Sequence, residues 1–122
     1  LGSAFDTGYV FDARIHGNTI SVADELAADG VFVFNAGGGV INAAITDNMI
    51  TYAGGQRAII VQQGQDGAAT TRATITGNNI DLLLNGGNNA DNAIVGTSGV
   101  ADPSGAGSFL DLNIGGAGAL AN

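Results

Sequence analysis

The chain has 122 residues, enough for one domain with a narrow core, and its content of 45% hydrophobic and 11% charged residues excludes a disordered protein. Its formal charge of −8 comes with only three basic residues, Arg14, Arg57 and Arg72, which argues against nucleic-acid partners and against anionic membrane surfaces. There is no cysteine, and no apolar run is long enough to insert into a membrane as a spanning helix.

The stretch from Leu1 to Phe11 precedes the first clear pattern and contains three aromatic residues among Gly, Ser and Asp. We interpret it either as the last part of a preceding coil or as an apolar lid. The partial coil is favoured, because Val10 and Phe11 continue directly into the segment that follows.

Three segments then repeat the pattern Ala-x-Ile-x-x-Asn-x-Ile at a spacing of 30 residues. They occupy Ala13–Ile20, Ala43–Ile50 and Ala73–Ile80. The shared columns are the first Ile (Ile15, Ile45, Ile75), the Asn (Asn18, Asn48, Asn78) and the second Ile (Ile20, Ile50, Ile80). A fixed period of this length is typical of a solenoid, in which successive repeats stack on one another.

Within each copy, apolar residues alternate with variable ones on both sides of a short turn, which predicts a strand, a tight corner and a second strand. The corner reads Gly-Asn or Asp-Asn, and Asn is one of the few non-glycine residues that tolerate a left-handed backbone. A third strand is expected in each repeat at Gly30–Phe34, Ala58–Val61 and Ala93–Val95, after loops of different lengths. One corner is therefore constant in length, and the other two vary.

A constant corner with Asn beside two variable corners resembles the right-handed parallel β-helix, the pectate-lyase-like superfold. The resemblance covers nearly the whole chain and implies that Asn18, Asn48 and Asn78 stack as an asparagine ladder, each amide bonding to its equivalent in the next coil. The alternative is that these residues are ordinary surface turns. A narrower resemblance, in the Gly-, Ser- and Asp-rich run from Ala93 to Gly116, is to the repeat regions of very large secreted bacterial proteins.

The predicted architecture is one all-β domain, a right-handed parallel β-helix solenoid of about four coils with three strands per coil. We divide it into coils at residues 12–41, 42–71 and 72–108, after the partial coil or lid at 1–11, with an incomplete last coil at 109–122. The last repeat is degenerate, since Ala117 stands where Asn is expected. No cap is evident at either end, which indicates a segment of a longer β-helix or a protomer with open ends.

Acidic residues gather in a few corners of the predicted solenoid. Asp24, Glu25 and Asp29 form one such corner, and their spacing matches neither a helical calcium loop nor a calcium-binding β-roll. We interpret this corner, together with Asp66 and Asp91, as solvated, and we expect no metal site.

Candidate catalytic residues are few. The period stacks Asp12, Asn42 and Arg72 in one column, and none of the columns that we compared holds the paired carboxylates that glycosidic cleavage needs. His16 is the only histidine and is expected to be an exposed strand residue. We therefore expect no catalytic residue and no cofactor.

The sequence favours a structural or interaction module: a β-helix rod segment of a secreted or cell-surface protein, used for adhesion or matrix building. Its partners would be further copies of itself, stacked end to end into filaments, or the adjoining coils of a longer chain. The alternative is a module that binds or cleaves polysaccharide, with a site along Gln62, Gln63 and Arg72 and the corner from Gly96 to Ser108.

Overall fold

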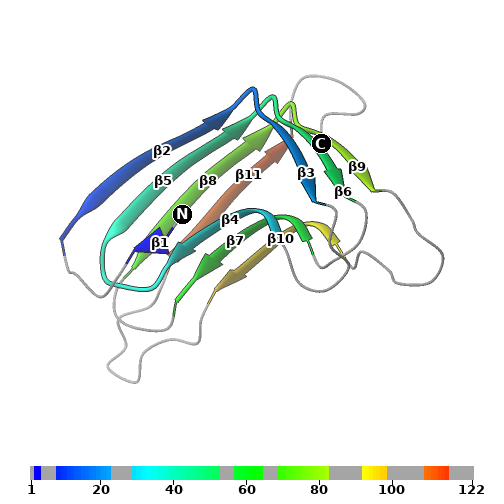
Figure 1. The fold of residues 1–122 in the computed structure, drawn as a ribbon. Coiled ribbons are helices and arrows are strands. Elements are labelled where there is room, and N and C mark those ends of the chain that lie inside the picture. The colour runs from blue at the N-terminus through cyan, green and yellow to red at the C-terminus, as the bar shows by residue number, and fades with distance from the viewer. Residues whose placement is uncertain are drawn as a thin grey trace.

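The computed structural model describes residues 2–3, 8–22, 29–52, 57–64, 69–82, 92–98 and 109–115. All regular elements in these ranges are β-strands, and they form three parallel sheets (Figure 1). Sheet A contains, in spatial order, β1 (Gly2–Ser3), β4 (Asp29–Asn35), β7 (Arg57–Gln63) and β10 (Asn92–Ser98). Sheet B contains β2 (Val10–His16), β5 (Val40–Thr46), β8 (Thr70–Thr76) and β11 (Phe109–Gly115). Sheet C contains β3 (Thr19–Val22), β6 (Met49–Tyr52) and β9 (Asn79–Leu82).

Successive strands visit the three sheets in turn, so that β2, β3 and β4 form one coil, β5 to β7 the next and β8 to β10 the third (Figure 1). Strand β1 lies before these coils in sheet A, and β11 lies beyond them in sheet B. Ala13 pairs with Ala43, and Ala43 pairs with Ala73, as the repeat predicts. The predicted β-solenoid of about four coils is therefore confirmed.

Sheet B has one apolar face and one polar face, because successive residues of a strand point to opposite sides. On β5 the inward residues Ile41, Ala43 and Ile45 are buried, whereas the outward residues Asn42 and Thr46 are half-buried. The parallel register repeats this division on the neighbouring strands. A shift of one residue in any strand would exchange the two faces, so burial of the apolar face fixes the register.

The core contains aliphatic columns that run along the solenoid, and each sheet contributes at least one of them. The columns are Ile15, Ile45 and Ile75 from sheet B, Ile20, Ile50 and Ile80 from sheet C, and Val31, Ile59 and Ile94 from sheet A. Ile45, Ile50 and Ile59 are fully buried, and burial of each such side chain contributes about 1.5–3 kcal/mol. Both Ile columns expected from the sequence thus lie in the core.

Sheet A differs from sheet B because one of its two interior strands, β7, is buried on both faces. Val33 and Val61 point into the coil, and Ile60 points outward, yet Ile60 is only 1% exposed. The outward rings of Phe32 and Phe34 stack beside it, with their centroids 5.8 Å apart. Parallel strands that are covered on both faces have continuous apolar sequences, which explains why β7 lacks the alternation of sheet B.

The constant corner lies between sheets B and C, and its left-handed residue is the one that precedes Asn. The backbone φ is 65° at Gly17, 56° at Asp47 and 66° at Gly77, whereas none of the three corner Asn residues has a positive φ. The sequence had suggested Asn as the residue that tolerates this conformation. The side chain of each corner Asn instead points into the coil, where it forms hydrogen bonds between coils.

Replacing Gly77 with Ala is expected to destabilise the fold more than replacing Gly17 with Ala. Both substitutions force a left-handed φ on alanine, at a cost of about 1–2 kcal/mol. At Gly77 the added methyl group would also meet Oδ1 of Asp47, and this exposed carboxylate must turn aside at a small additional cost, whereas at Gly17 nothing lies within 4 Å of the methyl group. Chemical denaturation of the two variants measures the difference, and equal losses would contradict the assigned contact with Asp47.

Candidate functional site

The three corner Asn side chains form a hydrogen-bonded ladder across the coils. Asn18 Nδ2 donates to Asn48 Oδ1 at 3.0 Å, and Asn48 Nδ2 donates to Asn78 Oδ1 at 2.8 Å. The backbone N–H groups of Asn18 and Asn48 donate to the same two oxygens, each at 3.0 Å. Each bonded Oδ1 therefore accepts two hydrogen bonds from the preceding coil, so the ladder predicted by resemblance is present.

The ladder also satisfies carbonyl groups at the ends of the sheet B strands. Asn48 Nδ2 donates to the Ile15 carbonyl at 3.0 Å, and Asn78 Nδ2 donates to the Ile45 carbonyl at 2.9 Å. Asn48 is 1% exposed and Asn78 is 5% exposed, whereas Asn18 is exposed at the first coil. The amides of Asn18 and Asn48 each donate to the Asn of the following coil. The Oδ1 of Asn18 is therefore the equivalent acceptor on the open side of the first coil.

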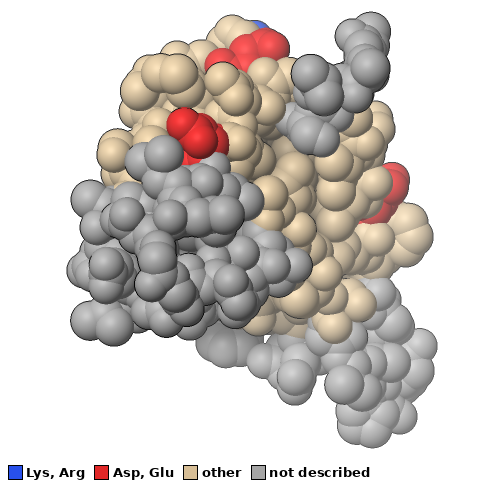
Figure 2. Space-filling model, turned by 90° about the vertical axis from the view of Figure 1, so that its right-hand side faces the viewer, with Lys and Arg blue, Asp and Glu red and all other residues tan. Residues whose placement is uncertain are grey.

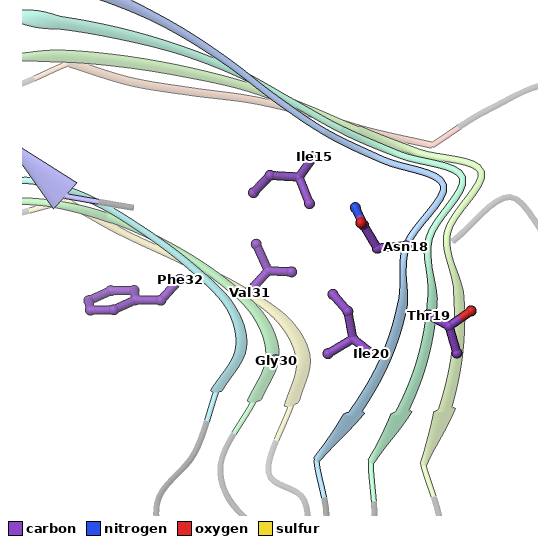
Figure 3. A pocket seen from close by; sticks show the side chains of 7 residues that line it. All are labelled: Ile15, Asn18, Thr19, Ile20, Gly30, Val31 and Phe32. Atoms are coloured by element: carbon purple, nitrogen blue, oxygen red, sulfur yellow. The ribbon is translucent and has the colours of Figure 1, made fainter.

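The open side of the first coil is hollow. A cavity of about 410 Å³ lies there, and Figure 3 shows Ile15, Ile20 and Val31 pointing into it from β2, β3 and β4. Asn18 reaches inward from the corner, whereas Phe32 points away from the bore (Figure 3). The lining is therefore the same set of columns that is buried between coils elsewhere in the solenoid. Its chemistry suits an apolar coil with a polar corner.

The outer face of sheet B carries the polar column suggested by the sequence. Asp12 pairs in register with Asn42, Asn42 with Arg72, and Arg72 with Asp111 on β11. Asn42 Nδ2 donates to Asp12 Oδ1 at 2.7 Å. Beside this column the small side chain of Ala44 leaves a hollow of about 420 Å³, which Asp12, Asn42, Arg72 and Thr74 also line. This arrangement combines a carboxylate, an amide, a guanidinium group and a hydroxyl group on one surface.

The residues expected to form a glycan face do not lie on one surface. Gln62 is half-buried on β7 in sheet A, and Arg72 is exposed on β8 in sheet B. Gln63 points into the coil and is 1% exposed. The corner from Gly96 to Ser108 is described only as far as Ser98, in β10. Of the three side chains, only that of Arg72 lines the outer hollow.

A second buried polar cluster lies at the ends of the sheet A strands, and the sequence reasoning missed it. Asn35 pairs in register with Gln63, and Asn35 Nδ2 donates to the carbonyls of Gly39 and Thr70, each at 3.2 Å. The Tyr9 hydroxyl donates to Asn35 Oδ1 at 2.7 Å, and the Thr71 hydroxyl donates to Gln63 Oε1. The sequence contained a signal for this cluster, since Asn35 and Gln63 are each the polar last residue of a largely apolar strand, but their spacing differs from the 30-residue period.

His16 lies on the outer surface at the constant corner. Its Nδ1 is 2.9 Å from the Thr46 hydroxyl oxygen and 3.2 Å from Asp47 Oδ2, and both His16 and Asp47 are exposed. An exposed pair of this kind contributes little to stability. The position agrees with the expectation of an exposed strand residue.

The acidic corners are only partly described. Asp29 forms an ion pair with Arg57 Nε at 2.9 Å, whereas Asp24, Glu25, Asp66 and Asp91 lie outside the described residues. Over the ranges that the structure does describe, no three His, Cys, Asp or Glu side chains gather as they would around a metal ion. On the face shown in Figure 2, the acidic side chains lie in separate places and do not form one patch. In the same ranges, no helix is long and apolar enough to cross a membrane.

Comparisons with protein-family models, with curated proteins and with solved structures found no match to this chain. The fold alone therefore defines the class of the protein, a parallel β-solenoid whose coils are joined by an asparagine ladder.

Proposed function

We propose that this protein is a structural module, a rod segment built from stacked β-coils whose open strand edges take up further coils. The observation that carries this proposal is the unbroken parallel register of sheets A, B and C, in which each coil is a template for the next. Parallel strands with an open edge are ready to pair with another chain. A rod that is extended by repeating the interface between coils needs no additional binding or catalytic site for this role.

The contacts between coils support this role because the same set recurs at every step. Met49 N donates to the Asn18 carbonyl and Asn79 N donates to the Asn48 carbonyl, each at 2.8 Å. The N–H group of Thr19 is the equivalent donor on the open side of the first coil. Together with Asn18 Oδ1, this N–H group offers an incoming coil the same donor and acceptor that are already hydrogen-bonded in the second and third coils.

The biological setting is proposed by analogy. The run from Ala93 to Gly116, rich in Gly, Ser and Asp, resembles the repeat regions of very large secreted bacterial proteins, so we place the rod in a secreted or cell-surface protein. Adhesion or matrix building would use such a rod as a rigid spacer. Its partners would be adjoining coils of a longer chain or further copies of the same chain.

Duplicating one coil tests the rod architecture. A second copy of residues 40–69 inserted after Ala69 keeps the register, because Val40 and Thr70 already occupy equivalent positions. The variant should fold, lengthen along the axis by about 4.8 Å in small-angle scattering, and unfold at a higher denaturant concentration.

The matched control inserts residues 40–54 alone, which breaks the order in which the chain visits the three sheets. This half-coil variant should lose stability. If the half coil were tolerated as well as the whole coil, the periodic contacts would not control the fold and the rod proposal would fail.

The outer face of sheet B supports a second candidate function, the binding or cleavage of polysaccharide. The observation that favours it is the hollow beside Ala44, where Asp12, Asn42, Arg72 and Thr74 present both donors and acceptors. Acidic and neutral glycans incubated with the protein would be assayed for binding and for new reducing or unsaturated ends. Binding or cleavage that disappears in Arg72→Ala would favour this function over the rod.

A further inference from the structure

We infer that copies of this chain associate end to end, with β11 of one copy paired in parallel with β2 of the next, and that opposed carboxylates of Asp111 and Asp12 weaken this junction. The inference rests on the proposed rod function and names its partner, a second copy of the chain. It follows from the distribution of apolar surface, from the strand count of the sheets and from the register.

Exposed apolar side chains are concentrated on the two edge strands of sheet B. The large hydrophobic residues that are exposed in the described ranges are Val10, Phe11, Phe32, Met49, Phe109 and Ile114. Four of these six lie on β2 or β11, the outermost strands in the order of sheet B. Val10 is 66% exposed and Phe109 is 53% exposed. The two edges that would meet in an end-to-end junction therefore carry most of the large apolar side chains that are exposed in the described ranges.

The strand count of the sheets matches this junction. Sheets A and B each contain four described strands, so stacking one copy on another advances both sheets by the same number of layers. Strand β1 supplies a sheet A strand before the first full coil, and β11 supplies a sheet B strand after the third. At the junction, β11 of one copy and β1 of the next would belong to the same layer. Each partial coil therefore supplies the strand that the other lacks in sheets A and B, whereas the described residues place no sheet C strand in this layer.

The internal register, continued across the junction, places apolar side chains opposite one another inside the bore. One column on the outer face contains Val10, Val40, Thr70 and Phe109, so the next layer pairs Phe109 with Val10 of the second copy. The inward pairs are then Leu110 with Phe11, Leu112 with Ala13, and Ile114 with Ile15. The larger Leu112 meets the small Ala13, and Ile114, which is 47% exposed, continues the central Ile column.

The outward side chains of the same register contain one unfavourable pair. Asp111 faces Asp12 of the second copy, whereas Asn113 faces Arg14. Directly opposed like charges destabilise neighbouring strands. The sequence also has Ala117 where the corner Asn of a further repeat is expected, so this repeat offers no ladder amide to the junction. The junction is therefore weaker than the internal interfaces and strengthens when the charges are screened.

Sedimentation velocity over a range of protein and salt concentrations tests the junction. The natural chain should form end-to-end oligomers whose affinity rises with NaCl. Asp111→Asn should tighten association at low salt by roughly five-fold, the effect of removing one opposed charge pair, and should reduce the salt dependence. The matched control is Asp47→Asn, which removes the same charge at a corner in the middle of the solenoid and should leave association unchanged.

Cross-linking tests the register, and the absence of cysteine makes introduced thiols unambiguous. A double variant with Asn113→Cys and Arg14→Cys places the two thiols opposite each other at the junction, within disulfide reach. Oxidation should yield a series of covalent oligomers. A variant with Asn113→Cys and Asp12→Cys, whose thiols are out of register by two residues, should yield far fewer.

Two results would overturn the junction. One is that the natural chain and Asp111→Asn both remain monomeric at every protein and salt concentration. The other is that the in-register and out-of-register cysteine pairs cross-link equally well. Neither result would contradict the rod proposal, which the coil duplication tests separately through folding and length.

Discussion

Replacing Asn48 with Asp is expected to lower the free energy of unfolding at neutral pH by about 3–5 kcal/mol, because it places an unpaired charge among acceptors. Asn48 is 1% exposed, and its Nδ2 donates to the Ile15 carbonyl and to Asn78 Oδ1. Asp has nearly the same shape, but at that position it offers an oxygen to two other oxygens. Chemical denaturation followed by circular dichroism measures the loss.

Two comparisons separate charge from shape and position. Asn48→Ala removes the hydrogen bonds without adding a charge, and it should cost about 1–3 kcal/mol because buried partners lose their bonds. Asn18→Asp makes the same chemical change on the exposed first rung, where water solvates the carboxylate, and should cost about 1 kcal/mol. If Asn18→Asp were as damaging as Asn48→Asp, burial would not be the reason that the ladder stabilises the fold.

The repeated corner could be predicted from sequence because it depends on two local features, a constant length and an Asn at a fixed position. Sheets B and C are joined by a corner of constant length, so Asn18, Asn48 and Asn78 recur at one period and their neighbouring Ile columns recur with them. The alternation of sheet B followed in the same way, since only one of its faces is buried. These two features carried enough information to place the sheet B and sheet C strands of three coils in register.

Sheet A was harder to predict in detail, because its strands follow loops of variable length and are apolar on both sides. A continuous apolar run such as Ile59 and Ile60 does not reveal which side chain points inward. The buried contacts of Gln63 with Thr71 and of Asn35 with Tyr9 join segments that no common period relates. For the same reason the sequence grouped Gln62 and Arg72, which the fold places in different sheets.

Replacing Ile45 with Ala is expected to cost about 2–5 kcal/mol, the range seen when a fully buried Ile is truncated. Ile45 is fully buried in the central coil, between Ile15 and Ile75 of its own column. Its neighbours lie on parallel strands that are hydrogen-bonded to both sides of β5, so they cannot move inward without disturbing the register. The cavity should therefore remain largely unfilled, and thermal denaturation should show a lower midpoint.

Ile15→Ala provides the matched control, because it deletes the same atoms from the same column at the open end of the solenoid. Ile15 is only half-buried and already lines the cavity of the first coil, so less contact is lost, and the cost should be about 1–2 kcal/mol. In a solenoid each coil is stabilised mainly by its nearest neighbours, and the central coil has two of them. Equal losses at Ile45 and Ile15 would mean that the first coil is covered in solution as fully as the second, which would place a further coil on β2 and β3.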